Sequence, residues 1–362
     1  MTEYTLYGRV VLCDRVIEDG AVSVSGSRIV YAGDRDAAPV RGEIISRGGT
    51  IMPGFVDIHC HAGGATWFYE DAAACAGYHL RHGTTTMCAT LYRDLGIDGI
   101  LSAIERIKAE MKKNPVICGV HIEGPYLNPE LGARSSGGDI CADPAEYMPI
   151  LDCGVLRHMT YAPEVRGTEQ LMRDLKSRGI KGSIGHSKAS PNEVRRAMEL
   201  GASNVTHIFD ATGAAVSPTR WGGTIEADFN VSALVCDGFT YEIICDRDGV
   251  HVRPEMVALV KKCAGVENII GITDACGGDG DGEDVNFLDG ELNGSKLTMN
   301  RVAANFVSLG FTLPEAAAVT SLNPARFLGM ENEIGSLEAG KRADIVVLDD
   351  DFGVRAVYKA KD

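Results

Sequence analysis

Short apolar segments recur along the chain, and several end at a residue that can bind a metal ion or move a proton. Six of them are rich in Val, Ile and Gly and are too short for a typical helix, so they predict buried strands. They span residues 54–61, 116–125, 159–164, 180–187, 204–210 and 269–275. Segments 83–91 and 241–246 predict two further strands, which makes eight in all.

Amphipathic segments separate these expected strands. They predict helices over 97–113, 168–178, 191–200 and 254–264, and Pro191 suits the first turn of its helix. Regular alternation of strands and helices favours either a parallel barrel or a doubly wound sheet. The number of strands favours the barrel, so the predicted fold class is α/β, with a (β/α)8 TIM-like barrel.

The two chain ends have a different pattern, in which short β-like runs alternate with turns. We therefore predict a small β-sandwich domain formed by both ends, residues 1–52 plus 331–362. Residues 53–330 would form the barrel domain. The long connections 211–240 and 276–295 follow the sixth and eighth strands, so both would lie on the catalytic face of a barrel.

The composition is that of an ordinary soluble protein: 362 residues, 45% hydrophobic and 23% charged. A net charge of −15 without a basic stripe argues against nucleic acid or an anionic membrane as partner. No apolar run approaches the ~18 residues of a membrane span, and the N-terminal segment lacks a signal-peptide pattern. The 11 cysteines are scattered singly, which fits a reducing compartment. We therefore expect a cytoplasmic protein.

The expected strand ends carry the chemistry of a metal site. Four of the nine histidines and one glutamate fall there: His59, His61, Glu123, His186 and His207. Imidazole and carboxylate together are the ligands that zinc and similar ions prefer. His59 and His61 would point to the same side of their strand because side chains alternate. Each residue alone has an ordinary explanation, such as a hydrogen-bonded histidine or an ion pair, but together they favour a metal site.

Three other polar residues need separate interpretations. Asp274 ends the last expected strand, where it can act as the general base towards a metal-bound water; the alternative is a helix cap or a loop anchor. Glu164 also ends an expected strand. His121 lies deeper in its strand than Glu123, so we predict a hydrogen-bonded core histidine there.

The order of the motifs resembles the amidohydrolase superfamily and, within it, the N-acetylglucosamine-6-phosphate deacetylase family. The resemblance covers nearly the whole chain through PGFVDIHCH (53–61), HIEGPYLNPE (121–130), YAPE (161–164), GHSKAS (185–190), NVTHIFDA (204–211), DGVHV (248–252), ITDA (272–275), LTMNRVAANF (297–306) and GSLEAGKRADIVVLD (335–349). It implies a β/α barrel with a β-sandwich domain made from both termini, and a homodimer with a shared substrate site.

The resemblance also implies roles for individual residues. Glu123, His186 and His207 would bind metal, and Asp274 would be the general acid/base. Some relatives replace the His-x-His pair and keep one metal. Because His59 and His61 are both present here, we expect one or two divalent ions per subunit, with zinc first and Fe, Mn or Co as alternatives.

The implied substrate residues include departures from the family pattern. Family members bind the sugar phosphate partly through an Arg and a His of the neighbouring subunit, for which Arg220 and His251 are the nearest matches. Arg134 stands where the family has a substrate-contacting His, and Asp210, followed by Ala211, stands where it has Asn. A carboxylate would repel a nearby phosphate. One hypothesis is that Arg134 and Asp210 together recognise another substrate; the alternative is that both are loop residues outside the site.

The function expected from these observations is hydrolysis of the N-acetyl group of an amino sugar phosphate. The metal would activate water, and Asp274 would take its proton and pass it to the departing amine. One alternative is an amidohydrolase for another N-acyl substrate, such as an unphosphorylated amino sugar or an N-acyl amino acid. A lower-ranked alternative is an inactive metal-binding scaffold, which the presence of Asp274 and every expected ligand disfavours.

Overall fold

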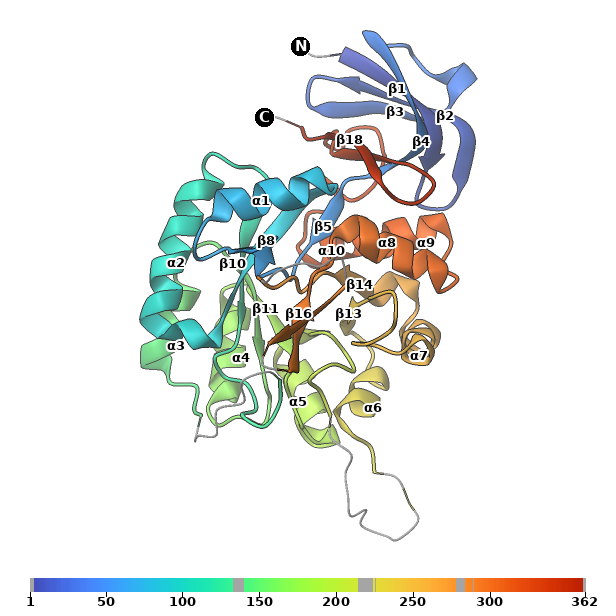
Figure 1. The fold of residues 1–362 in the computed structure, drawn as a ribbon. Coiled ribbons are helices and arrows are strands. Elements are labelled where there is room, and N and C mark those ends of the chain that lie inside the picture. The colour runs from blue at the N-terminus through green and yellow to red at the C-terminus, as the bar shows by residue number, and fades with distance from the viewer. Residues whose placement is uncertain are drawn as a thin grey trace.

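A barrel of eight parallel strands forms the centre of the molecule (Figure 1). The computed structural model describes residues 3–132, 140–213, 224, 226–277, 284–288 and 290–360. In sheet order the barrel strands are β5 (Phe55–Asp57), β8 (Thr84–Tyr92), β9 (Ile117–Glu123), β10 (Leu156–Tyr161), β11 (Lys181–Ile184), β12 (Ala202–Val205), β13 (Thr240–Ile244) and β14 (Ile269–Ile272). Each of the eight overlaps a predicted strand, although β12 does so only at residues 204 and 205.

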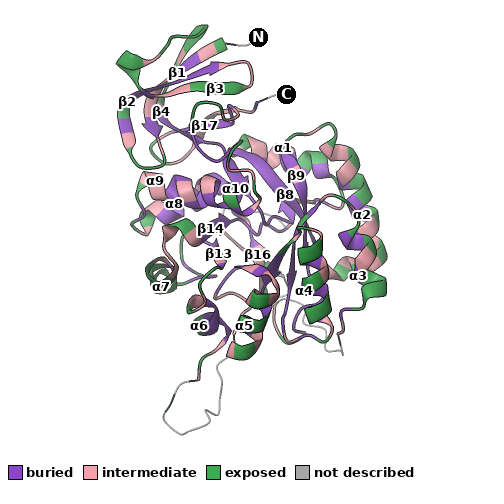
Figure 2. Ribbon diagram, turned by 180° about the vertical axis from the view of Figure 1, so that it is seen from behind, coloured by how far each residue is buried: buried purple, intermediate pink, exposed green. Residues whose placement is uncertain are grey.

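The barrel closes beyond the ends of its first and last strands. The backbone N–H of Asp274 donates to the carbonyl of His59 (2.9 Å), and the N–H of His61 donates to that of Ala275 (2.9 Å). Side chains face the barrel interior on one side of each strand and the surrounding helices on the other, so the strands are apolar on both faces. Figure 2 shows buried strands and helices with exposed outer faces. The predicted fold class is confirmed.

Helices follow the strands and cover the barrel. They are α1 (Ala72–Arg81), α2 (Gly96–Met111), α3 (Pro144–Leu151), α4 (Thr168–Ser177), α5 (Pro191–Leu200), α6 (Phe229–Leu234), α7 (Pro254–Ala264), α8 (Met299–Ser308), α9 (Leu313–Ala317) and α10 (Asn323–Phe327). Single turns of tighter or wider helix occur at Arg35–Ala37, Arg93–Leu95, Val266–Asn268 and Ala318–Leu322. The four predicted helices are confirmed as α2, α4, α5 and α7. Helix α5 begins with a capping box formed by Ser190 and Glu193.

The two chain ends together build a second sheet, which lies at one end of the barrel beside both termini (Figure 1). Its six strands, in order, are β18 (Val354–Tyr358), β17 (Ile345–Leu348), β4 (Glu43–Pro53), β1 (Glu3–Val11), β2 (Val16–Ser25) and β3 (Arg28–Asp34). Strand β17 pairs antiparallel with β4 and so joins the C-terminal segment to the N-terminal one. Apolar residues of both segments form a core separate from that of the barrel. The precise domain boundaries stay predictions.

Two small hairpins stand on the face where the barrel strands end. One pairs β6 (Ala62–Gly63) with β7 (Thr66–Trp67), and the other pairs β15 (Val285–Leu288) with β16 (Glu291–Ser295). The second hairpin belongs to the long connection 276–295, and α6 belongs to the connection 211–240. None of the helices formed by the described residues combines the length and apolar character that a membrane crossing requires.

Candidate active site

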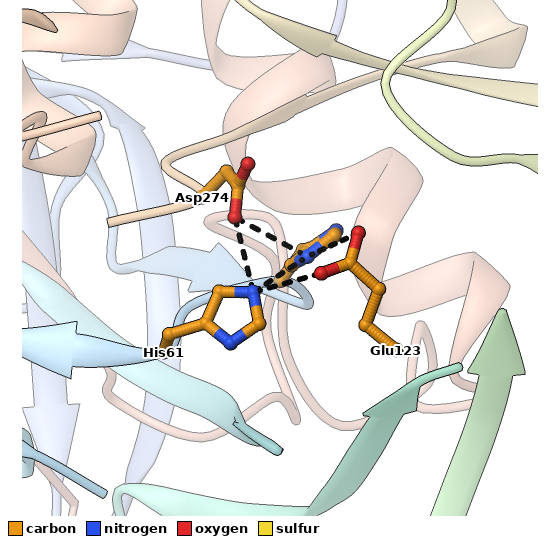
Figure 3. A group of neighbouring side chains, drawn as sticks. His61, Glu123 and Asp274 are labelled. Carbon is orange, nitrogen blue, oxygen red and sulfur yellow. Dashed lines mark hydrogen bonds and ion pairs between the residues drawn. The ribbon is translucent and has the colours of Figure 1, made fainter. Parts of the chain in front are cut away.

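The residues predicted at the strand ends meet at the carboxyl end of the barrel. His59 and His61 follow β5, Glu123 is the last residue of β9, His186 follows β11, His207 follows β12 and Asp274 follows β14. All of these side chains are buried except His186, which is partly buried. Figure 3 shows His61, Glu123 and Asp274 pointing towards one another; Glu123 ends a strand, and the other two lie in the segments that follow their strands.

Four of these residues form a first group, which we call the His59 group: His59, His61, Glu123 and Asp274. Nε2 of His61 lies 3.1 Å from Oε2 of Glu123 and 3.2 Å from Oδ1 of Asp274. Nε2 of His59 lies 3.3 Å from the same Asp274 oxygen. One potential ligand atom from each residue lies within 4.8 Å of the others, which is compact enough for a single ion.

Glu123 also belongs to a second group, which we call the His186 group: Glu123, His186 and His207. Its Oε1 atom lies 2.9 Å from Nε2 of His186 and 2.9 Å from Nε2 of His207. Oε1 also lies 3.6 Å from Nε2 of His59, whereas the close contact with His61 uses Oε2. Glu123 therefore belongs to both groups and could be a ligand in either.

The electrostatics of the two groups fit a divalent cation. Burial alone would disfavour charge on the imidazoles, but the Asp274 and Glu123 carboxylates raise the pKa of His59 well above its ordinary value. In the same way Glu123 raises the pKa of His207 to about 9, against the effect of burial. Burial opposes ionisation of Glu123 as well, but His59 and His186 hold its pKa well below the usual range. A metal ion supplies the positive charge that protons on these rings otherwise provide.

Hydrogen bonds on the far side of two rings direct their Nε2 atoms into the site. Nδ1 of His59 donates to Oε2 of Glu242 (3.0 Å), and Nδ1 of His207 donates to the carbonyl of Asp210 (3.0 Å). A ring that donates through Nδ1 presents its Nε2 lone pair to a metal. Our sequence interpretation missed Glu242, although a charged residue within the apolar strand β13 was the signal that could have found it.

Three site residues lie in sharp turns directly after their strands. The backbone φ angles are 45° at His186, 26° at His207 and 45° at Asp274, which L-residues seldom adopt. The chain also approaches His186 closely from Gly132, where a Cβ atom would lie 2.6 Å from Nδ1 of the ring. These turns and the close approach orient the side chains across the barrel mouth.

Comparison with known proteins agrees with this geometry. The family model described as the amidohydrolase family matches residues 50–361. The chain belongs to the amidohydrolase family. It is 32% identical over 346 residues to the N-acetylgalactosamine-6-phosphate deacetylase of Shewanella sp. (strain ANA-3), covering 86% of this chain and 82% of that protein. It is 29% identical over 387 residues to the N-acetylglucosamine-6-phosphate deacetylase of Bacillus subtilis (strain 168), covering 95% and 92%.

A solved structure matches over almost the whole amidohydrolase chain. N-acetyl-D-glucosamine-6-phosphate deacetylase from Mycobacterium smegmatis, in complex with N-acetyl-D-glucosamine-6-phosphate, superposes with a TM-score of 0.86. The match covers 99% of this chain and 98% of that one at 28% identity. The resemblance inferred from the motifs is confirmed. The amidohydrolase fold and the buried His/Glu/Asp groups together identify a metal-binding site.

Two polar residues of this amidohydrolase lie near the site without joining either ligand group. Glu164 accepts hydrogen bonds from the Asn128 amide (2.9 Å), the Ser187 hydroxyl (2.6 Å) and the Lys188 N–H (2.7 Å), and so braces the loop after His186. His121 is a hydrogen-bonded core residue, as predicted: its ring contacts two threonine hydroxyls.

A cavity of about 740 Å³ opens onto the ligand groups. Among the predicted substrate residues, Asp210 and Ala211 line it. His251 is not among the described residues that line the cavity. Its Nδ1 donates to Asp246 (3.0 Å), and its Nε2 donates to the carbonyl of Gly294 (2.9 Å). Gly294 itself lines the cavity. Arg134 and Arg220 lie outside the described residues. The sequence interpretation missed several other lining residues, for which no motif gave a signal; among them are Trp67, Tyr92, Arg93, Asn286 and Lys296.

Proposed function

We propose that this amidohydrolase removes the N-acetyl group from an N-acetylated amino sugar phosphate. The observation that carries the proposal is the pair of buried ligand groups that share Glu123, beside a cavity that Asp274 also lines. The names of the relatives add the substrate class, since they are deacetylases of N-acetylglucosamine-6-phosphate and N-acetylgalactosamine-6-phosphate.

The donor set is suited to one or two divalent ions, of which zinc fits imidazole and carboxylate best, with Fe, Mn or Co as alternatives. The His59 group would hold one ion and the His186 group the other. When bound, such ions polarise a carbonyl and lower the pKa of water.

Asp274 is the proposed general acid/base. Burial disfavours its ionised form, but His59 and His61 keep the pKa of its carboxyl group below the ordinary value, so it can accept a proton at neutral pH. Its close contacts with both rings use Oδ1. Oδ2 would therefore take the proton from the attacking water and then deliver it to the amine as the C–N bond breaks.

We further propose that the enzyme is a cytoplasmic homodimer whose neighbouring subunit completes the substrate site, as the family resemblance implies. Arg220 and His251 are the candidate phosphate ligands. Within its own chain His251 is held by Asp246 and Gly294, so any contribution from its ring requires that one of these hydrogen bonds be exchanged.

A second candidate function is favoured by Asp210. Asp210 lies three positions after His207 and lines the cavity. Its carboxylate would repel a phosphate group bound nearby. The second candidate is therefore hydrolysis of another N-acyl substrate, such as an unphosphorylated amino sugar or an N-acyl amino acid.

The experiment is to measure acetate release by zinc-loaded protein from N-acetylglucosamine-6-phosphate, N-acetylgalactosamine-6-phosphate and both unphosphorylated sugars. We expect turnover of a phosphorylated sugar, and an Asp274→Asn variant slower by about 10²–10⁴-fold. Turnover of the unphosphorylated sugars alone would favour the second candidate. Protein that binds metal but hydrolyses none of the four would contradict the proposed function.

A further inference from the structure

Two aromatic side chains line the cavity and a third packs against both of them, and we call the three the aromatic wall: Trp67, Tyr92 and Tyr69. The ring centroid of Trp67 lies 5.3 Å from that of Tyr92 and 5.8 Å from that of Tyr69, and Tyr69 and Tyr92 are 6.1 Å apart. Trp67 and Tyr92 line the cavity directly, with Tyr69 packed against both. Trp67 and Tyr92 are only partly buried, so their rings offer an apolar surface to a ligand in the cavity.

The aromatic wall lies against the His59 group. The His61 ring meets Tyr92 edge-on at 5.7 Å and Trp67 at 6.4 Å. The β6–β7 hairpin explains the position of Trp67, because it turns the chain back directly after His61 and is closed by a hydrogen bond from the Phe68 N–H to the His61 carbonyl (3.0 Å).

A second segment of the site also holds the indole in place. A Cβ atom at Gly277 would lie 2.4 Å from Nε1 of Trp67, so the ring packs against the backbone just after Asp274. The segments that follow β5 and β14 both carry residues of the His59 group, and both position the indole. The wall is therefore held relative to the reacting centre.

Polar residues line the cavity near His186 and His207, which follow β11 and β12. In the strand order of the barrel, these strands lie across from β5 and β8, which lead to the aromatic wall. Asp210 and Glu130 line the cavity there, together with Gly132, which contacts the His186 ring. A substrate amide at Glu123 and Asp274 has two substituents that point in opposite directions, since a secondary amide is planar and trans. Sugar hydroxyl groups suit the polar side, and an apolar acyl group suits the aromatic side.

We propose that the aromatic wall is the acyl subsite of this enzyme, and that it accepts N-acyl groups longer than acetyl. This inference rests on the proposed function. Water adds its oxygen to the acyl carbon, the C–N bond breaks, and the products are a carboxylate and the sugar amine. An acetyl methyl covers little of two aromatic faces, so each further methylene gains contact. We expect kcat/KM to rise by about 4-fold per added methylene until the wall is covered.

The main experiment compares N-acetyl, N-propionyl and N-butanoyl derivatives of the sugar that the enzyme hydrolyses best, using wild-type protein, Trp67→Ala and Trp67→Phe. Trp67→Ala is expected to remove the dependence of kcat/KM on acyl length while metal content and the preference between sugars stay the same. Trp67→Phe should retain part of the dependence. The matched control is Phe287→Ala, which removes another ring that lines the cavity from the β15–β16 hairpin; it should preserve the dependence on acyl length.

A second measurement does not require turnover. Acetate, propionate and butanoate are the corresponding products, and hexanoate extends the series. The affinities of these four carboxylates for zinc-loaded protein can be measured by calorimetry. Affinity should rise with chain length in wild-type protein and not in Trp67→Ala. If no N-acyl sugar is hydrolysed but this trend is present, the acyl subsite is supported and the sugar assignment fails. If Trp67→Ala weakens every acyl derivative and carboxylate equally, or if chain length has no effect in wild-type protein, the acyl subsite is contradicted.

Discussion

Glu242 lies 3.0 Å from Nδ1 of His59, and neither side chain is exposed to solvent. The other oxygen of Glu242 accepts a hydrogen bond from the Asn204 amide (2.7 Å), which fixes the carboxylate inside the barrel. A buried carboxylate that orients a ligand imidazole raises the basicity of the ring and keeps its metal-binding nitrogen in place. The metal site therefore extends beyond the residues that would touch the ion.

The first prediction concerns this contact. Glu242→Gln should weaken metal binding by the His59 group by about 10–100-fold, because the ring loses a charged hydrogen-bond acceptor. The affinity can be measured by competition with a chelator. Glu169→Gln, on the exposed surface of α4, is the matched control. Equal affinity in both variants and the wild type would show that Glu242 does not support the metal.

The second prediction concerns the number of ions. Wild-type protein should bind two divalent ions per chain, His61→Ala should retain one in the His186 group, and His186→Ala should retain one in the His59 group. The reason is that the two ligand sets share only Glu123. Elemental analysis of dialysed protein measures the stoichiometry. A single ion in wild-type protein, lost completely in His186→Ala and retained in His61→Ala, would contradict a two-metal site.

The third prediction tests the charge of Asp210. Asp210→Asn should raise kcat/KM for a phosphorylated sugar by about 5-fold, which corresponds to removing ~1 kcal/mol of repulsion between like charges. The unphosphorylated sugar should be unaffected, and it serves as the internal control. Added salt should reduce the effect if the interaction is exposed to solvent. If both sugars respond equally, Asp210 does not face the phosphate.

The fourth prediction concerns acid stability. His158 stacks on His121 at 3.8 Å inside the barrel, and burial lowers the pKa of His158 from 6.5 to about 4. The unfolded chain therefore takes up a proton before the folded protein does as the pH falls from 6.5 towards 4. The free energy of unfolding should decrease there by up to ~1.4 kcal/mol per pH unit through this ring, with no such effect above pH 6.5.

His158→Asn provides the comparison for this effect. Urea unfolding at pH 7, 6 and 5 should show a smaller loss of stability with acidification in the variant than in the wild type, whatever their difference at pH 7. If the free energy of unfolding fell equally with acidification in both proteins, His158 would not be held neutral in the folded state.

Local pattern was sufficient for the eight barrel strands, for helices α2, α4, α5 and α7, and for the ligand candidates. Strands such as β9 are buried on both faces, so their sequences are mostly apolar throughout. In β9 this apolar run ends at a charged residue, Glu123. Their polar ends could be assigned to one site because parallel barrel strands all end on the same face. Glu164 shows the limit of this reasoning, since it also follows an apolar strand but braces a loop.

The sequence by itself determined the order of strands and helices, the barrel and the residue types available for a metal site, because burial periodicity and strand ends are local properties of the chain. Only the tertiary structure decided which of those residues share Glu123, that Glu242 orients His59, and that Trp67 and Tyr92 meet beside His61. These contacts join segments far apart in the chain, and their distances depend on how the barrel closes and where the hairpins fold back. No local pattern encodes that geometry.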